Sequence, residues 1–332
     1  MGLVQIEELG TIETNIALTG TLCIDKIASG VIEDSLMNNP EIGYTTGSVN
    51  PIVLECNDSD LNKARDRILS KDDYFKALNA LDTDFLQGNV GAGCGMTCHG
   101  FKGGIGSSSR IINIDGTNYT IAILCNSNFG TSNGKDLIFK GRPLGDAIKE
   151  YNQEHEDKGS IVCVFATDIP LNERQIKRVL KRIEIGIGRT GSYAGNGSGD
   201  LFIGFTTANK RQHFTDKAIT ASTYLSDEYI NQIFKRTVEM TEEAVLNSML
   251  YSHTVKGYQS TNKSLMEYKH LFNDLLEKEA QDELAVQKEK AKQMIDKNVL
   301  TELEKRFLDA NALPEDPEEQ PKKTKLEQIT ES

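Results

Sequence analysis

The sequence predicts an α+β fold, an αββα four-layer sandwich in which two stacked sheets lie between outer layers of helices. In each half of the chain, strand-like segments come first and segments with helical periodicity follow. Elements grouped in this order indicate sheets with helices packed on one face, whereas regular alternation is typical of α/β folds. The 332 residues, 38% of them hydrophobic, are enough for a substantial core.

The first half opens with two predicted strands, residues 14–25 and 47–57, which are rich in Thr, Ile and Val. Two helices are expected next, over residues 60–69 and 71–81, because apolar residues recur there at helical spacing. Glycines then dominate residues 88–106, which predicts a segment without regular structure whose backbone packs closely against its surroundings.

A strand pair is predicted over residues 111–114 and 119–125, turning at Asp115 and the glycine after it. A polar loop with a short helix over residues 144–153 then leads to a buried strand that starts at Ser160. An exposed loop of this kind tolerates a break in the chain.

The second half repeats the order of strand and helix. After the strand, a helix is predicted to begin at Asn172, with Gln175 three residues later in the position that completes a capping box. A further buried strand is expected over residues 201–206, and a long amphipathic helix over residues 229–251.

Composition argues against several classes of function. The net charge of -12 disfavours binding to nucleic acids or to anionic membranes. No apolar stretch approaches about 18 residues, and the first residues include Glu7, Glu8 and Glu13, so neither a transmembrane helix nor a signal peptide is predicted. The six scattered cysteines are typical of reduced, buried thiols in a cytoplasmic protein.

The pair Gly159-Ser160 has the composition that a self-cleaving hydrolase needs. The glycine carbonyl has no Cβ to shield it, and the serine Oγ can attack it in an N-to-O acyl shift. Hydrolysis then frees an N-terminal serine, which carries a nucleophile and its own amine as base, with a pKa of roughly 7.7–8.0. Four other Gly-Ser pairs occur, at Ser48, Ser107, Ser192 and Ser198, and such pairs alone are usually turns.

Four segments give this pair its context: residues 50–58, 88–110, 159–171 and 189–203. In sequence and order they resemble the self-processing serine aminopeptidases, the family of the L-aminopeptidase/D-esterases and β-peptidyl aminopeptidases. The resemblance implies an N-terminal-nucleophile-like fold with the αββα layout. It also implies a homo-oligomer, a tetramer, that needs neither a metal nor an organic cofactor.

The resemblance also implies roles for individual residues. Ser160 corresponds to the nucleophile, Ser198 and Asp200 to the supporting serine and acid, and Asn128 to the oxyanion donor. Glu55 corresponds to the acid that binds the free amino group of the substrate. Two residues later some family members have tyrosine, where this chain has Asn57, so the substrate preference of those members does not carry over.

Two of these residues, Ser198 and Asp200, are two residues apart in an extended segment. Strand alternation therefore puts them on one face, from which both would reach Ser160 if the two strands are neighbours.

The domain prediction follows from this resemblance and from composition. Residues 1–274 are expected to form one catalytic domain, cut into an alpha chain, residues 1–159, and a beta chain, residues 160–332. Residues 275–313 are predicted to form a charged amphipathic helical extension, and residues 314–332, rich in Pro, Glu and Lys, a disordered tail.

Several other chemistries are weaker interpretations of the same residues. Lys102 is followed by glycine, which breaks the order of a phosphate-binding P-loop. Cys94, Cys98 and His99 lack the paired spacing of a zinc site. The five histidines and six cysteines leave a Ser-His-Asp triad and a Cys-His protease as alternatives.

The function predicted is that of a self-activated aminopeptidase acting on a small peptide, amino-acid amide or ester. A self-cleaving acyltransferase on the same fold is the first alternative. A non-catalytic scaffold protein is the second.

Overall fold

The computed structural model describes residues 2–131, 134–148 and 158–296, in two compact units, Met1–Glu267 and Tyr268–Ser332. The helices of the first unit are α1 (Gly2–Leu9), α2 (Ile24–Asn38), α3 (Lys71–Asn79), α4 (Glu173–Leu180), α5 (Ile183–Arg189) and α6 (Asn231–Leu250). Its longer strands are β1 (Ile16–Gly20), β2 (Ile52–Cys56), β5 (Gly104–Ile114), β6 (Thr117–Asn128), β9 (Lys158–Thr167) and β10 (Gly197–Thr206). Its two-residue strands are β3 (Thr97–Cys98), β4 (Phe101–Lys102), β7 (Ile138–Phe139), β8 (Arg142–Pro143), β11 (Val255–Lys256) and β12 (Thr261–Asn262).

The main sheet has four strands in the order β10-β9-β6-β5. The strand β9 is parallel to β10 and antiparallel to β6, so the strand that starts around Ser160 lies inside the sheet. The predicted hairpin is present as β5 and β6, whose turn places Asp115 at φ 50° and Gly116 at φ 82°. Positive φ at both central residues matches the right-handed twist of the two strands.

A second, two-stranded parallel sheet, β1 with β2, stacks on one face of the main sheet. The core between the two sheets contains apolar residues from both: Ile52, Leu54, Cys56, Met96, Val162 and Ile203. Helices α2 and α3 cover the outer face of the small sheet, where Ile27, Val31 and Tyr74 pack on Val53.

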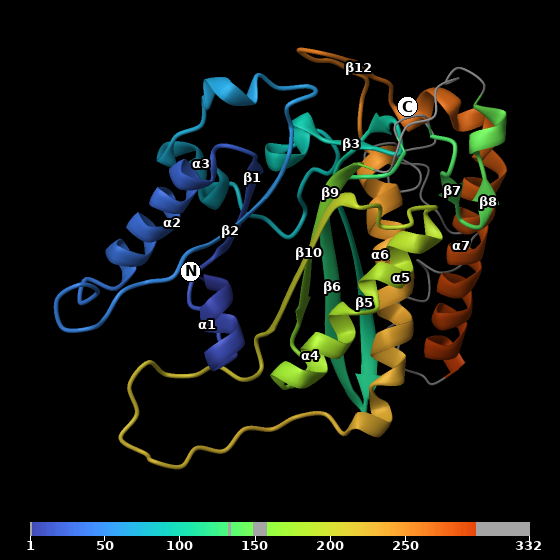
Figure 1. The fold of residues 1–332 in the computed structure, drawn as a ribbon. Coiled ribbons are helices and arrows are strands. Elements are labelled where there is room, and N and C mark those ends of the chain that lie inside the picture. Colours follow the sequence, from blue (N-terminus) through green and yellow to red (C-terminus); the bar gives the residue numbers. More distant parts are fainter. Residues whose placement is uncertain (1, 132–133, 149–157, 297–332) are drawn as a thin grey trace, which may run out of the picture. The chain divides into compact units, whose positions relative to one another are not determined.

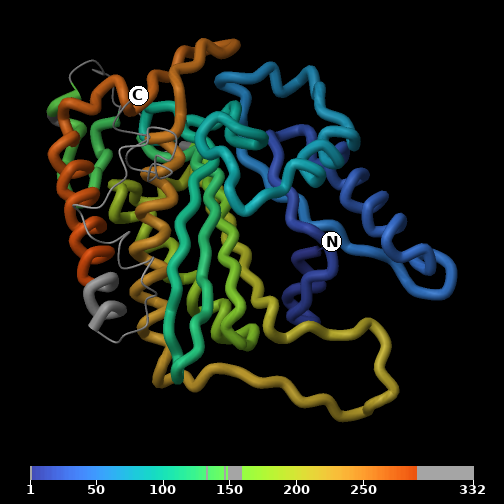
Figure 2. The backbone as a smooth tube through the Cα atoms, turned by 180° about the vertical axis from the view of Figure 1, so that it is seen from behind, coloured from blue at the N-terminus to red at the C-terminus, as the bar shows by residue number. Residues whose placement is uncertain are grey.

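Helices α4, α5 and α6 lie on the other side of the main sheet. Ile176 and Leu180 of α4 lie beside Gly204 of β10, and the α6 backbone at Ala244 lies against Gly106 of β5. The layers therefore run helix, sheet, sheet, helix (Figures 1 and 2), which confirms the αββα prediction.

One helix prediction was wrong, and helices α1 and α2 were not predicted. Residues 60–69 contain only a 3₁₀ turn, Ala64–Asp66, since Arg67 adopts a left-handed conformation, φ 46°, that ends it. Helix α2 replaces the end of the strand predicted over residues 14–25, because Ile27 and Val31, four residues apart, form one apolar face.

The boundaries of other predicted segments differ or lie partly outside the described residues. Helix α7 (Asn273–Asp296) of the second unit begins two residues before the predicted extension, and the rest of that extension and the tail lie outside. Of the helix predicted over residues 144–153, residues 149–153 lie outside the described residues. The described part contains a 3₁₀ turn, Gly145–Ala147.

Two further observations concern predictions from composition. Within the described ranges no helix combines the length and apolar character needed to cross a bilayer. All six cysteines are free thiols, and five are buried, whereas Cys94 is exposed, contrary to the expectation of buried thiols.

Candidate active site

The main sheet brings the predicted nucleophile beside two other predicted segments. Ser160 on β9 pairs with Asn128 on β6 and, on its other side, with Gly199 on β10. Ser198 and Asp200 flank Gly199 on the same strand. Three regions far apart in the sequence thus meet at the amino end of β9.

The Ser160 hydroxyl contacts the carbonyl group that it would attack. Its Oγ donates a hydrogen bond to the Gly159 carbonyl oxygen at 2.7 Å, and the residue is half-buried. The nucleophile and the carbonyl group are therefore in direct contact in the uncut chain.

The backbone at Gly159 requires glycine. Its φ is +147°, which side chains rarely adopt, and a Cβ there would lie 2.1 Å from the Asn128 carbonyl oxygen. Only a residue without a Cβ lets β9 approach β6 this closely at the predicted cut.

We expect Gly159→Ala to destabilise the fold and to prevent chain cleavage. The backbone conformation costs roughly 1–3 kcal/mol for a residue with a side chain, and the clash with β6 moves the carbonyl away from Ser160 Oγ. Thermal unfolding and a denaturing gel measure the two effects. Gly188→Ala is the control, since a Cβ at Gly188 meets no atom within 4 Å. Normal cleavage in Gly159→Ala would contradict this expectation.

The Asn128 side chain is buried, 6% exposed, and is held at both ends of its amide. Its Oδ1 accepts from the Thr97 backbone N–H at 2.9 Å, and its Nδ2 donates to the Asn57 carbonyl oxygen at 2.9 Å. An amide nitrogen carries two N–H donors, so one remains for a ligand. Paired residues share a face of the sheet, so this amide lies on the face of the Ser160 side chain.

Ser198 and Asp200 form a hydrogen-bonded pair. The Ser198 hydroxyl donates to an Asp200 carboxylate oxygen at 2.7 Å, as expected for side chains on one face of an extended strand. The two residues are in register with Gly159 and Ile161, so β9 and β10 are neighbouring strands.

Alternation, however, puts this pair on the face opposite the Ser160 side chain. The pair therefore borders the Gly159-Ser160 peptide from the next strand and does not face the hydroxyl, which differs from the expectation. The reason is the register: Gly199, not Ser198 or Asp200, is opposite Ser160.

Gly199 was not singled out from the sequence, and it keeps space beside the nucleophile. A Cβ at this position would lie 3.1 Å from Ser160 Oγ. We expect Gly199→Ala to slow cleavage and turnover about tenfold, because small displacements of reacting groups have large kinetic effects. A time course of chain cleavage measures this, again with Gly188→Ala as control. An unchanged rate would mean that a methyl group at position 199 does not displace the Ser160 hydroxyl.

Glu55 lies on the small sheet rather than beside Ser160. Leu54 and Cys56 point into the core between the sheets, so Glu55 between them points to the other face of β2. Its Oε2 is buried without a hydrogen-bond partner, as is Oδ1 of Asp58. Asn57 is exposed and contributes its backbone carbonyl, which holds Asn128.

Three carboxylates lie within electrostatic range of the Cys56 thiol. Burial, together with the negative charges of Glu55, Asp200 and Asp58, raises the pKa of Cys56 to about 12. Glu55 and Asp58 lie on or just after β2 and Asp200 lies on β10, so negative charge from two segments of the chain acts near Cys56. A positively charged group, such as a substrate ammonium, is favoured there.

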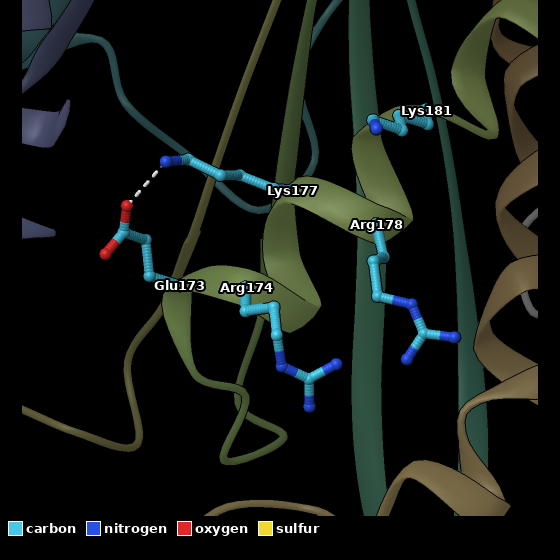
Figure 3. Close-up of a pocket in the computed structure, with 5 residues that line it drawn as sticks. All are labelled: Glu173, Arg174, Lys177, Arg178 and Lys181. Carbon is cyan, nitrogen blue, oxygen red and sulfur yellow. Dashed lines mark ion pairs between the residues drawn. The ribbon is translucent and has the colours of Figure 1, made fainter.

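A separate pocket of about 350 Å³ lies against α4 and is lined by charged residues: Glu173, Arg174, Lys177, Arg178 and Lys181 (Figure 3). Lys177 pairs with Glu173 at 2.7 Å, and Arg174 and Arg178 both pair with Asp227. Three of its four cations are thus already paired, and it includes none of the predicted site residues. Across the described ranges, no cluster of three or more His, Cys, Asp or Glu side chains could hold a metal ion.

Several known proteins have a sequence or fold similar to that of this chain. The sequence pattern of peptidase family S58 matches residues 1–263. Beta-peptidyl aminopeptidase BapA of Sphingosinicella xenopeptidilytica is 34% identical over 271 residues, which cover 77% of this chain and 67% of that protein.

Two solved structures have a similar fold. The PH0078 protein from Pyrococcus horikoshii OT3 has a TM-score of 0.75 and 44% identity, covering 81% of this chain and 74% of that one. The L-aminopeptidase D-Ala-esterase/amidase from Ochrobactrum anthropi, described as a variant of the Ntn hydrolase fold, has a TM-score of 0.68 and 30% identity. That alignment covers 77% of this chain and 73% of the other.

Proposed function

This chain belongs to peptidase family S58 and is a serine-type aminopeptidase of the N-terminal-nucleophile hydrolase fold, and on this basis we propose that it activates itself by cutting the Gly159-Ser160 bond. The observation that carries the proposal is the 2.7 Å contact between Ser160 Oγ and the Gly159 carbonyl oxygen. Gly159, without a Cβ, leaves that carbonyl open to attack.

The cut proceeds through an ester. Ser160 Oγ attacks the Gly159 carbonyl carbon, the C–N bond breaks, and the serine nitrogen takes a proton to become a free amine. Water then hydrolyses the ester, which leaves a carboxylate on Gly159 and restores the Ser160 hydroxyl. The chain breaks at the start of β9, and the sheet hydrogen bonds on both sides keep the new terminus in place.

The mature enzyme uses the same atoms on its substrate. The Ser160 amine takes the hydroxyl proton while Oγ attacks the substrate carbonyl, and then gives that proton to the leaving amine. The free N–H of Asn128 donates to the oxyanion, and the Ser198–Asp200 pair beside the serine nitrogen supports the charged amine. Water releases the acyl group in a second step.

The substrate class follows from charge. Glu55, Asp58 and Asp200 favour a cation near Cys56, and a free N-terminal ammonium is the cation that an aminopeptidase substrate carries. We therefore propose small peptides, amino-acid amides or esters with a free amino group. Blocking that group by acetylation is expected to abolish hydrolysis.

A homo-oligomer, a tetramer, is part of this proposal. The segment between β10 and α6 extends away from the sheets (Figures 1 and 2) and exposes Phe214, Ile219 and Tyr224. Exposed apolar groups of this kind favour association with another protein surface. Light scattering of the purified protein measures the mass in solution.

The proposal is tested by intact mass and N-terminal sequencing of the purified protein. Two chains, residues 1–159 and 160–332, with the second beginning at Ser160, are expected. Hydrolysis of an amino-acid p-nitroanilide by this material is the second readout. A single uncut chain without hydrolysis would contradict self-activation and favour the scaffold alternative.

A further inference from the structure

Lys102 is a lysine of β4 whose side chain is fully buried. Its ammonium donates to three backbone carbonyl oxygens, those of Gly93 and Met96 at 2.8 Å and that of Gly103 at 2.7 Å. All three of its N–H donors are therefore used. Burying an ammonium is costly, so such an arrangement is expected to have a specific purpose.

The three carbonyls belong to the glycine-rich segment. Its glycines permit close packing: a Cβ at Gly93 would lie 2.5 Å from the Gly88 carbonyl oxygen, and one at Gly103 would lie 2.3 Å from that of Ser127. Backbone hydrogen bonds also hold this segment, among them the one that the Gly103 N–H donates to the Met96 carbonyl oxygen at 3.0 Å. The Lys102 ammonium adds a charged donor that joins three of its carbonyl groups at one point.

One of these bonds leads directly to the oxyanion donor. The Met96 carbonyl and the Thr97 N–H belong to the same peptide group, which is planar and rigid. Lys102 donates to the oxygen of this peptide group, and the Thr97 N–H of the same group donates to Asn128 Oδ1 at 2.9 Å. Donation to the carbonyl also polarises the peptide and strengthens its N–H as a donor.

We propose that Lys102 is a positioning residue: it holds the Met96-Thr97 peptide group, and through it orients the Asn128 amide for oxyanion stabilisation. This inference rests on the role given to Asn128 in the proposed function. It adds a residue that contacts neither the nucleophile nor the substrate.

The charge of Lys102 gives the proposal a pH signature. Burial lowers the pKa of its ammonium to about 8, although the nearby Cys94 and Cys98 side chains act in the opposite direction and favour the charged form. The neutral amine that forms above this pH has two N–H donors for three carbonyls. The peptide group is then held less firmly, so kcat is expected to fall as the pH rises through about 8.

The first test is Lys102→Met, which keeps most of the length of the side chain and removes the donors. A drop in kcat of about 10–10²-fold with little change in KM is expected, together with loss of the alkaline fall in the pH profile. Lys256→Met, at an exposed lysine on β11, is the control and should keep wild-type kinetics.

A double variant separates positioning from simple stability. If Lys102 acts through Asn128, Lys102→Met combined with Asn128→Ala should lose no more kcat than Asn128→Ala alone. Additive losses would overturn the proposal, because they would mean that Lys102 acts independently of the amide.

Hydrogen exchange tests the same contact without any activity. In an uncut Ser160→Ala chain, Lys102→Met is expected to speed exchange of the Thr97 N–H at least tenfold relative to Lys256→Met, and unchanged exchange would overturn the proposal. If Lys102→Met does not fold, the protection of Thr97 in the parent chain should decrease between pH 7 and pH 9. A wild-type enzyme without hydrolysis would refute the proposed function, while these exchange rates still decide the role of Lys102.

Discussion

Ser160→Ala is expected to give a single uncut chain of 36.7 kDa that hydrolyses no aminoacyl substrate. The substitution removes the Oγ that lies against the Gly159 carbonyl and leaves both flanking strands unchanged. Without cleavage, the serine nitrogen stays an amide and cannot act as a base. The loss of turnover should therefore reach background. A denaturing gel, intact mass and a chromogenic aminoacyl amide give the three readouts.

Two companion variants make this experiment specific. Ser48→Ala removes the serine of another Gly-Ser pair, at an exposed position, and should cleave normally. Ser160→Cys keeps a nucleophile, so partial cleavage at the same bond is expected. Cleavage of Ser160→Ala at an unchanged rate would exclude Ser160 as the nucleophile of the self-cleavage step.

Asn128→Ala is expected to lower kcat by about 10²–10³-fold, the usual effect of removing one oxyanion donor. It also leaves the half-buried Thr97 N–H without its acceptor, which costs about 1–3 kcal/mol of stability. Steady-state kinetics and thermal unfolding measure the two effects separately.

Asn128→Asp distinguishes the two roles of this side chain. The carboxylate keeps an acceptor for Thr97 but has no N–H for the oxyanion or for the Asn57 carbonyl, so kcat should fall at least as far as in Asn128→Ala. Asn118→Ala, at an exposed position on the same strand, is the matched control. A kcat within threefold of wild type in both Asn128 variants would remove this residue from the oxyanion site.

Local sequence signals predicted many of the elements. The capping box is present, with Asn172 and Gln175 each bonded to the backbone of the other, because its chemistry acts over three residues. The hairpin turn at Asp115 and the long helix α6 follow from equally local patterns. The helix predicted over residues 60–69 rested on apolar spacing alone and is absent; Ile68, one of its apolar residues, is 84% exposed.

The sequence by itself determined the family, the layered fold and the residues worth testing, because motif order and hydrophobic periodicity are properties of the chain. The tertiary structure decided which of those residues meet. Strand register placed Gly199, and not Ser198 or Asp200, opposite Ser160, and it turned Glu55 away from the core between the sheets. Register and burial depend on contacts between distant segments, and therefore only the folded chain revealed that Lys102 and Asn128 bind the same peptide group.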